Sequence, residues 1–219
     1  MRPPAAAILP ALFAALTPER QEELNVANAR FFRPPPGGDS AGAGGASGVG
    51  GERTRKELPK RIAANTWPRS SRGRRLRRAA ARPYVMGVEV RELSHSHPLG
   101  RGEELELGLF AARDFGTCDV VGEYCGEVYE GDGGSEYATY LEDREGDSRY
   151  PLGVDATREG NECRFINHFA GIASEPNVAM RIAYVNELPV VMVICTKDIA
   201  CGEELLLRYS DEFVEEYCS

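Results

Sequence analysis

From residue 84 onward, hydrophobic residues occur in short runs separated by Gly, Pro, Asn and Asp, a pattern typical of many short strands. The runs 177–184 and 190–196 predict a hairpin, and residues 136–142 fit a helical turn or a short strand equally well. The remaining runs that predict strands are 85–90, 106–111, 120–128, 152–155 and 205–209. With only a short terminal helix expected over 211–217, the pattern indicates a mostly β domain with short helices over 84–219.

The first 83 residues follow a different pattern. Pro18 begins a stretch with acidic residues in its first turn, which predicts a helix over 18–32 that the prolines at 34–36 would end. Residues 37–51 are rich in Gly, Ala and Ser and predict a flexible linker. We therefore expect residues 1–83 to be a low-complexity, basic and mostly disordered region ahead of the domain at 84–219.

The net charge of −8 conceals two parts of opposite sign. Residues 1–83 carry 16 basic and 6 acidic side chains, a balance of +10, whereas residues 84–219 carry 10 and 28, a balance of −18. An acidic domain attracts basic peptides by electrostatic steering, although an acidic surface that only confers solubility has the same composition.

The basic residues concentrate in 69–82, which contains R-G-R-R-L-R-R. A nuclear-localisation signal, a weak nucleic-acid contact through phosphates and a solvated charge run all fit this segment. The segment lacks interleaved aromatic residues, so stacking on single-stranded bases is not supported. Of these, we favour nuclear targeting, because the resemblance described below for residues 84–213 suggests a nuclear function.

Cysteines and apolar runs exclude some classes of protein. The six cysteines form no Cys-x-x-Cys pair, which indicates reduced thiols and no zinc site, and His95 and His97 fit loop histidines rather than metal ligands. No apolar run is long enough to cross a bilayer, so no membrane association is predicted. The apolar residues 1–16 faintly resemble a targeting peptide, but Pro10 splits them and few basic residues precede them.

The segment 160–177, G-N-E-C-R-F-I-N-H-F-A-G-I-A-S-E-P-N, sets Phe165 and Ile166 beside an asparagine and a histidine. A surface loop has little use for the apolar pair, and a buried core tolerates the polar pair only when hydrogen bonds satisfy it. A buried turn with one satisfied histidine fits this pattern, and so does a segment whose polar groups face a pocket. Two further stretches favour the pocket.

Those stretches are 108–128, G-L-F-A-A-R-D-F-G-T-C-D-V-V-G-E-Y-C-G-E-V, and 198–209, D-I-A-C-G-E-E-L-L-L-R-Y. With 160–177, in this order and spacing, they resemble the SET-domain family of protein-lysine methyltransferases. The resemblance covers roughly residues 84–213. It implies a β-clip-like fold of small curved sheets with a C-terminal pseudoknot, in which the last segment passes beneath the Asn-His loop. It also implies S-adenosyl-L-methionine as the cofactor and a protein lysine as the substrate.

The resemblance also assigns roles to single residues. Tyr209 matches the family's terminal tyrosine at the point of methyl transfer, and Tyr124 matches a tyrosine that lines the lysine channel, so both are predicted to be catalytic. Leu207, at a position that limits how many methyl groups fit, and Phe213 are predicted to line the same channel. The positions predicted to bind the cofactor are Gly108, Leu109, Phe110, Tyr140, Arg164, Phe165, Asn167 and His168.

Three residues depart from the family pattern: Glu106, Phe169 and Arg208 stand where Gly, Ser and Asp are common. No Cys-x-Cys-x4-Cys motif follows Tyr209, so we expect Phe213 or Tyr217 to cover the channel in place of a zinc-bound tail.

We therefore predict an S-adenosyl-L-methionine-dependent methyltransferase that acts in the nucleus on a lysine of a basic peptide, with a histone tail as the first candidate. The departures support a second hypothesis, a SET-like chromatin-binding module with little catalysis. The apolar N-terminus supports a third, a methyltransferase of a non-histone protein in the chloroplast or another organelle.

Overall fold

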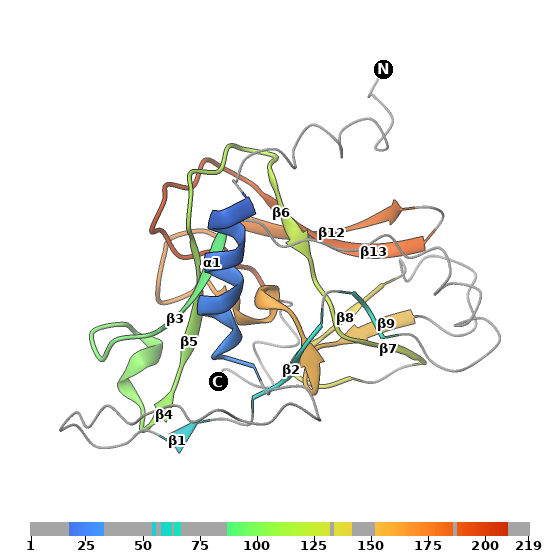
Figure 1. Ribbon diagram of the computed structural model, residues 1–219, viewed down its shortest axis with the longest axis horizontal. Helices are drawn as coiled ribbons and strands as arrows, with labels where there is room; N and C mark the ends of the chain where they lie inside the picture. Colours follow the sequence, from blue (N-terminus) through green and yellow to red (C-terminus); the bar gives the residue numbers. More distant parts are fainter. Residues whose placement is uncertain are drawn as a thin grey trace.

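The computed structural model describes residues 18–32, 54–55, 58–62, 64–66, 87–131, 134–141, 152–185 and 188–209. Within these residues the chain forms one α-helix, two 3-10 turns and many short strands, which confirms the predicted mostly β class (Figure 1). The helical elements are α1 (Pro18–Ala29), η3 (Leu99–Arg101) and η4 (Glu162–Phe165). The strands are β1 (Thr54–Arg55), β2 (Lys60–Arg61), β3 (Val88–Glu92), β4 (Glu104–Leu105), β5 (Leu107–Ala111), β6 (Val120–Glu123), β7 (Glu127–Glu130), β8 (Ala138–Tyr140), β9 (Leu152–Asp155), β10 (Glu159–Gly160), β11 (Asn167–His168), β12 (Val178–Val185), β13 (Leu188–Cys195) and β14 (Leu206–Leu207).

The strands pair into small sheets instead of one large one. Two sheets have three strands, in the orders β12-β13-β6 and β7-β9-β8, and both are antiparallel. The two-stranded sheets are β3-β5, which is antiparallel, and β1-β4, β10-β2 and β11-β14, which are parallel. Each sheet is too small to enclose a core alone, so the core lies where the sheets meet. Its fully buried members include Leu109, Val154, Val193 and Leu205.

The predicted hairpin is confirmed as β12 and β13, which lie side by side and are the longest strands among the described residues (Figure 1). Their register runs from Val178 opposite Cys195 to Val185 opposite Leu188. Both strands are rich in Val and Ile, whose branched side chains suit a pleated surface. The register with β6 shifts between Val193 and Ile194, an irregularity that interrupts the regular pairing of the two strands.

The single strand predicted over 120–128 is wrong, because the structure divides it into β6 and β7. β6 pairs with β13, whereas β7 pairs with β9 in a different sheet. The chain changes sheets across 124–126, where a Cβ on Gly126 would lie 2.3 Å from the carbonyl oxygen of Asp155. Only glycine permits this approach, so the change of sheet is fixed in the sequence at one small residue.

The other predicted strands hold with shifted ends. The runs 106–111, 152–155 and 205–209 contain β5, β9 and β14, and the run 136–142 contains the strand β8 rather than a helical turn. The run 85–90 overlaps β3, which extends to Glu92. The predicted helix over 211–217 lies outside the described residues, as do the linker 37–51, the basic segment 69–82 and residues 1–16.

The C-terminal segment runs between β5 and β11. On one side the Leu205 amide donates to the Leu109 carbonyl at 2.7 Å, and on the other β14 pairs in parallel with β11. The Asn177 side chain closes the crossing, because it donates to the Glu204 carbonyl and accepts from the Leu206 amide, both at 2.7 Å. This is the passage beneath the Asn-His segment that the family resemblance implies.

Parts of the N-terminal region belong to the same core. The predicted helix 18–32 is observed as α1, which ends at Ala29, and Phe31 and Phe32 follow it in a hydrogen-bonded turn and are buried. Asn28 fixes the helix to β3, since its side chain donates to the Val88 carbonyl at 3.2 Å and accepts from the Val90 amide at 3.0 Å. Further along, β2 pairs with β10, so a second N-terminal stretch also lies against the domain.

Candidate active site

Two tyrosines from distant parts of the chain have their hydroxyl groups fixed in the same way. The Tyr209 hydroxyl donates to the Ile166 carbonyl at 2.7 Å, and the Tyr124 hydroxyl donates to the Tyr137 carbonyl at 2.8 Å. A phenol carries one proton, so each oxygen presents only lone pairs to any further partner. The site therefore offers two hydrogen-bond acceptors whose own protons are already committed to the main chain.

The Tyr124 hydroxyl stays neutral in this setting. Burial raises its pKa well above the usual value, the positive charge of Arg164 opposes this, and Tyr209, Asp155 and Tyr137 raise it further. Tyr124 is 5% exposed, so solvent does little to screen these neighbours. These interactions place Tyr124 and Tyr209 in one electrostatic environment, and they make a phenolate at Tyr124 unavailable near neutral pH.

His168 holds the main chain of Tyr209. The Tyr209 amide donates to Nδ1 of His168 at 3.0 Å, and the two rings lie 5.2 Å apart between centroids. Burial, together with the positive charge of Arg208, lowers the pKa of His168 below its usual value. The ring is therefore neutral at pH 7, and because Nδ1 accepts a hydrogen bond, its proton lies on Nε2 and remains a donor.

Asn167 is fixed on the opposite side of β11. Its Nδ2 donates to the Leu107 carbonyl at 3.0 Å and to Oε1 of Glu204 at 2.9 Å, which uses both amide hydrogens. The other carboxylate oxygen of Glu204 lies 2.9 Å from Nε2 of His97, so the buried carboxylate is held from two directions. The side-chain oxygen of Asn167 is thus left as an acceptor in a fixed orientation.

The strand β5 brings main chain close to this cluster. A Cβ on Gly108 would lie 2.8 Å from Oε1 of Glu204, so glycine allows the carboxylate to reach Asn167. The Leu109 side chain is fully buried, and the guanidinium of Arg91 lies 4.8 Å from the centroid of Phe110. The predicted role of these three residues in cofactor binding stays a prediction, and for Leu109 only the backbone can fulfil it.

The other predicted site residues make separate contacts. The guanidinium of Arg164 lies 4.0 Å from the centroid of Tyr137, and its Nε donates to the Ala156 carbonyl at 3.0 Å. Phe165 instead packs edge-on against Phe32, at 5.5 Å between centroids, so its side chain supports α1. Leu207 is buried, Tyr140 is half-buried in β8, and Phe213 lies outside the described residues.

Residues 106–210 match the family model described as the SET domain. The chain contains a SET domain. Three curated relatives that it resembles are a histone-lysine N-methyltransferase EZH2 of Chaetomium thermophilum, an H3 lysine-4 specific histone-lysine N-methyltransferase of Schizosaccharomyces pombe and the N-lysine methyltransferase KMT5A of Xenopus tropicalis. They are 32%, 35% and 34% identical to it over 63%, 50% and 48% of this chain. The chain spans only 9%, 12% and 33% of the length of these three relatives.

A solved structure described as ctPRC2 in an autoinhibited conformation bound to S-adenosylmethionine also resembles the chain. It is 31% identical, the match covers 58% of this chain and 16% of that chain, and the TM-score is 0.44.

Two of the departures from the family pattern contact each other in this SET domain. The guanidinium of Arg208 lies 4.7 Å from the centroid of Phe169, and the Phe169 amide donates to the Leu207 carbonyl at 3.0 Å. A cation over an aromatic face is attractive, so the unusual arginine and the unusual phenylalanine stabilise one position of the segment after His168. The third departure, Glu106, accepts from the Leu93 amide through its carbonyl at 2.9 Å.

The family resemblance selected Tyr140 for cofactor binding, which stays a prediction, and it did not predict the contacts that Tyr137 makes. In the SET domain, the Tyr137 carbonyl accepts the hydrogen bond of the Tyr124 hydroxyl, and the Arg164 guanidinium lies over the Tyr137 ring. Tyr140 instead pairs with Gly153 in a sheet. The sequence holds no local signal for this, because the acceptor is a main-chain carbonyl and depends on the path of the turn before β8. Glu204 and His97 were also missed as a pair, since they are separated by more than a hundred residues.

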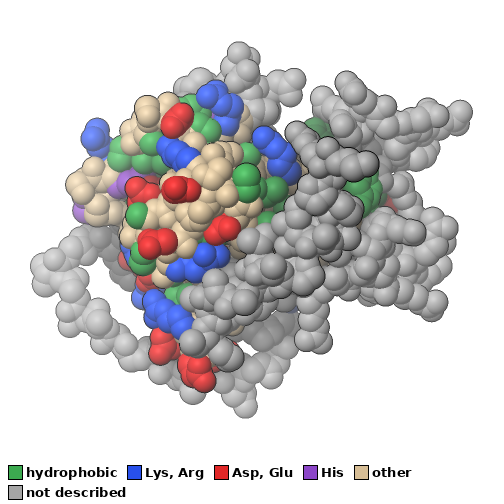
Figure 2. All heavy atoms as spheres, turned by 90° about the horizontal axis from the view of Figure 1, so that it is seen from above, with side chains coloured by type: hydrophobic (Ala, Val, Ile, Leu, Met, Phe, Trp, Pro, Cys, Tyr) green, Lys and Arg blue, Asp and Glu red, His purple; other side chains and the backbone are tan. Residues whose placement is uncertain are grey.

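The described residues show neither a surface patch of one charge on the face in view nor a group of metal ligands. On the face seen in Figure 2, acidic and basic side chains of the described residues are interspersed instead of gathered by sign. Among the described residues, no group of three or more His, Cys, Asp or Glu side chains is placed to hold a metal ion. None of the helices in the described ranges is long and apolar enough to cross a membrane.

Proposed function

We propose that this SET domain transfers a methyl group from S-adenosyl-L-methionine to the side chain of a protein lysine. The observation that carries the proposal is the shared state of Tyr124 and Tyr209, whose hydroxyl protons are committed to main-chain carbonyls at 2.8 and 2.7 Å. A lysine ammonium carries only donors, and a sulfonium methyl group carries weak C–H donors. Two acceptors without free protons suit both groups and would repel neither.

The chemistry sets a clear requirement for the chain. When bound, S-adenosyl-L-methionine supplies a methyl group activated by a positively charged sulfur. The lysine must lose a proton to solvent before its Nζ lone pair can attack the methyl carbon, and a buried channel favours this neutral form. Tyr209 and Tyr124 would hold the amine in line with the methyl group through their oxygens, so that little entropy is lost on reaching the reactive geometry. The new N–C bond would form as the S–C bond breaks, with its electron pair retained by the sulfur.

The residues of β11 offer an acceptor and a donor to different polar groups of the cofactor. Asn167 offers a side-chain oxygen to an ammonium group, because both of its amide hydrogens are used elsewhere. His168 offers an Nε2 proton to an acceptor, because its Nδ1 accepts from the Tyr209 amide at 3.0 Å. Because the two side chains lie on opposite sides of β11, we assign them to different groups of the ligand: the Asn167 oxygen suits a donor such as an ammonium, and the His168 Nε2 proton suits an acceptor.

We further propose that the substrate lysine lies in a basic peptide such as a histone tail, and that the protein acts in the nucleus. The names of the relatives support histones as the first substrate to test. The balance of −18 over residues 84–219 supports attraction of a basic peptide, and the basic segment 69–82 supports nuclear import.

The test is methyl transfer by the full chain, with labelled cofactor and whole core histones as substrate. We expect label on a histone and a loss on the order of 100-fold in kcat for Tyr209→Phe, which keeps the ring and removes the oxygen. Tyr184→Phe, which removes a hydroxyl from a side chain that is 63% exposed, is the matched control and should retain full activity. No transfer to any histone or basic peptide would refute the enzyme, and cofactor binding without turnover would favour a chromatin-binding module instead.

A further inference from the structure

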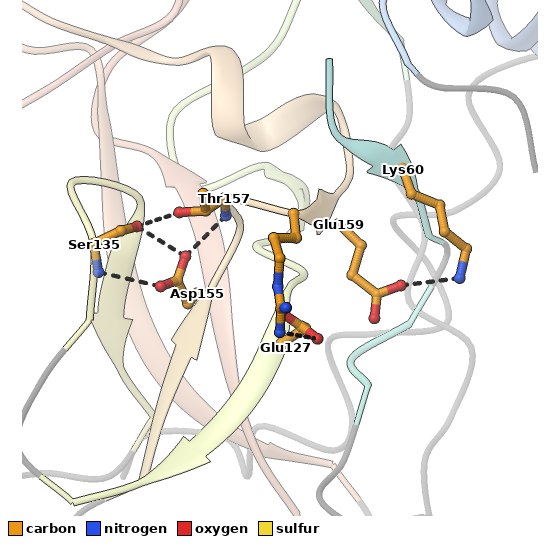
Figure 3. Close-up of polar contacts among 7 residues, drawn as sticks. Lys60, Glu127, Ser135, Asp155, Thr157 and Glu159 are labelled. Carbon is orange, nitrogen blue, oxygen red and sulfur yellow. Dashed lines mark hydrogen bonds and ion pairs between the residues drawn. The ribbon is translucent and has the colours of Figure 1, made fainter. Parts of the chain in front are cut away.

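The turn before β8 is fixed by a carboxylate that the proposed reaction does not use directly. Asp155 accepts the Ser135 amide at 3.1 Å, the Ser135 hydroxyl at 2.9 Å and the Thr157 amide at 2.8 Å (Figure 3). Burial opposes its ionisation, but the hydrogen bonds from Thr157 and Ser135 outweigh this and lower the pKa of Asp155. The carboxylate is therefore ionised at neutral pH and attaches the 134–137 turn to the end of β9.

The hydrogen bonds continue from this turn to Tyr124. The Ser135 hydroxyl oxygen accepts the Tyr137 amide at 3.0 Å, and the Ser135 carbonyl accepts the Ala138 amide at 3.0 Å. The Tyr137 carbonyl then accepts the Ala156 amide at 3.1 Å and the Tyr124 hydroxyl at 2.8 Å. Asp155 and its neighbour Ala156 thus fix both the turn and the carbonyl that receives the Tyr124 proton.

Gly134 and Arg164 further restrict the 134–137 turn. Gly134 has a φ of +137°, and a Cβ there would lie 2.3 Å from the Ala138 Cβ, so the turn can close only with glycine. Arg164 lies over the Tyr137 ring at 4.0 Å and is itself held by the Ala156 carbonyl. The position of the Tyr137 carbonyl is therefore determined by several independent contacts.

We propose that Asp155 and Ser135 are positioning residues that orient the Tyr124 hydroxyl through the carbonyl of Tyr137, and so set which methylation states of the lysine the channel accepts. This rests on the proposed methyl transfer. A phenol donates along the direction of its acceptor, so the place of the Tyr137 carbonyl decides where the lone pairs of Tyr124 point. Lone pairs aimed at the amine hold its N–H bonds, and each methyl group added to the nitrogen removes one of those bonds.

The alternative is that Asp155 only closes a surface turn and stabilises the fold. A double-mutant cycle separates the two, because an effect that passes through the Tyr124 hydroxyl must vanish when that hydroxyl is absent. We would measure kcat and the ratio of mono-, di- and trimethylated peptide for Ser135→Ala in the full chain and in the Tyr124→Phe background. Tyr124→Phe keeps the ring of the channel wall, so turnover remains measurable.

We expect Ser135→Ala to lower kcat about fivefold, the worth of one hydrogen bond, and to change the product ratio. In the Tyr124→Phe background the same change should alter both by less than about twofold. Ser135→Thr, which keeps the hydroxyl, should restore both values. An equal loss in the two backgrounds would overturn the proposal.

A matched control comes from a second clamp of the same chemistry. Asp198 accepts the Thr117 amide at 2.8 Å and the Thr117 hydroxyl at 2.9 Å, but it joins the turn after Phe115 to the end of β13 instead of reaching Tyr124. Thr117→Ala should leave kcat and the product ratio unchanged. A loss there equal to that of Ser135→Ala would also overturn the proposal.

A readout without catalysis separates this inference from the proposed function. In protein labelled at the ζ carbon of tyrosine, the NMR signal of Tyr124, assigned by its loss in Tyr124→Phe, reports the hydrogen bond of its hydroxyl. We expect Ser135→Ala to shift this signal and Thr117→Ala to leave it in place. A shift in a protein without methyl transfer would refute the enzyme and leave the positioning role standing, whereas an unmoved signal would overturn the positioning role whatever the activity.

Discussion

Glu123 and Tyr124 are consecutive residues, yet they connect to opposite kinds of surroundings. Glu123 is 6% exposed and accepts from the Asn65 side chain at 2.7 Å, so it holds the N-terminal segment 58–66. Tyr124 donates to Tyr137 and belongs to the candidate active site. One change of sheet after β6 therefore serves both a structural attachment and a site.

The two regions use different chemistry. The N-terminal segment is attached by charged groups, with Lys60 3.0 Å from Glu159 and Arg61 paired with the buried Glu162 (Figure 3 shows the first pair). The tyrosine cluster, formed by Tyr124, Tyr137 and Tyr209, is held by hydrogen bonds from neutral hydroxyls to main-chain carbonyls. Charged attachments respond to pH and to loss of one partner, whereas neutral ones keep their geometry across the same range.

The attachment of the N-terminal segment should be sensitive to the loss of one charge. Arg61 donates to Glu162 from Nε at 2.9 Å, and Glu162 is 2% exposed, so Arg61→Ala leaves a buried carboxylate without its cation. Because the Arg61 side chain is 35% exposed, we expect a loss of about 2 kcal/mol in the free energy of unfolding, below the range for fully buried pairs. Urea denaturation measures it.

Arg20→Ala is the matched control for this variant. Arg20 pairs with Glu23 at 2.9 Å, but those side chains are 49% and 66% exposed, so the expected loss is at most about 0.5 kcal/mol. Well below the unfolding temperature, kcat of Arg61→Ala should stay close to that of the parent protein, since the tyrosine cluster is intact. A loss of stability no larger than that of Arg20→Ala would show that the segment is not attached by this pair.

A second test of the charged region uses the pH dependence of stability at Glu123. Burial raises its pKa from 4.5 to about 7, so between these values the folded state holds a proton that the unfolded state has released. Stability from this group therefore falls as pH rises from 4.5 to 7, by an amount on the order of 3 kcal/mol. Glu123→Gln, which does not titrate, should be increasingly stable relative to the parent protein from pH 5 to pH 8.

The measurement for Glu123 is the difference in free energy of unfolding between the two proteins at each pH, because other carboxyl groups titrate equally in both. A difference that does not change with pH would mean that Glu123 is already ionised in the folded state. Cofactor binding should be the same in both proteins at every pH tested, since Tyr124 and not Glu123 faces the candidate site.

The residues of the candidate site could be predicted from the sequence, whereas the contacts of the N-terminal segment could not. The motif around Asn167 and His168, together with Tyr209, predicted the candidate site, because these residue types at this spacing resemble the SET-domain pattern. The contact of Glu123 with Asn65 spans 58 positions of the sequence, and that of Arg61 with Glu162 spans 101 positions. Contacts over such separations could not be predicted. A charged residue carries no local sign of its distant partner.

The same limit applies inside the site. The run 120–128 has the composition of one buried strand, and the division at Gly126 depends on how close the main chain of Asp155 comes. Tyr137 acts through its carbonyl, which every residue possesses, so no pattern of side chains could distinguish it from Tyr140. Sequence patterns predicted most of the strands and did not predict where the main chain makes contact.

The smallest expected effect concerns the neutral state of His168 in the candidate active site. Nδ1 of His168 accepts the Tyr209 amide only while the ring is neutral, and the charge of Arg208 adds to burial in lowering its pKa. Arg208→Ala should therefore raise the pKa of His168 and move the acid limb of the pH–rate profile to higher pH, with kcat at pH 8 little changed. Arg181→Ala, which removes an exposed arginine whose guanidinium donates to the Met180 carbonyl at 2.9 Å, should leave the limb in place. An acid limb that does not move in Arg208→Ala would mean that burial alone keeps His168 neutral, and the contact between Arg208 and Phe169 would then serve only to hold the segment after the histidine.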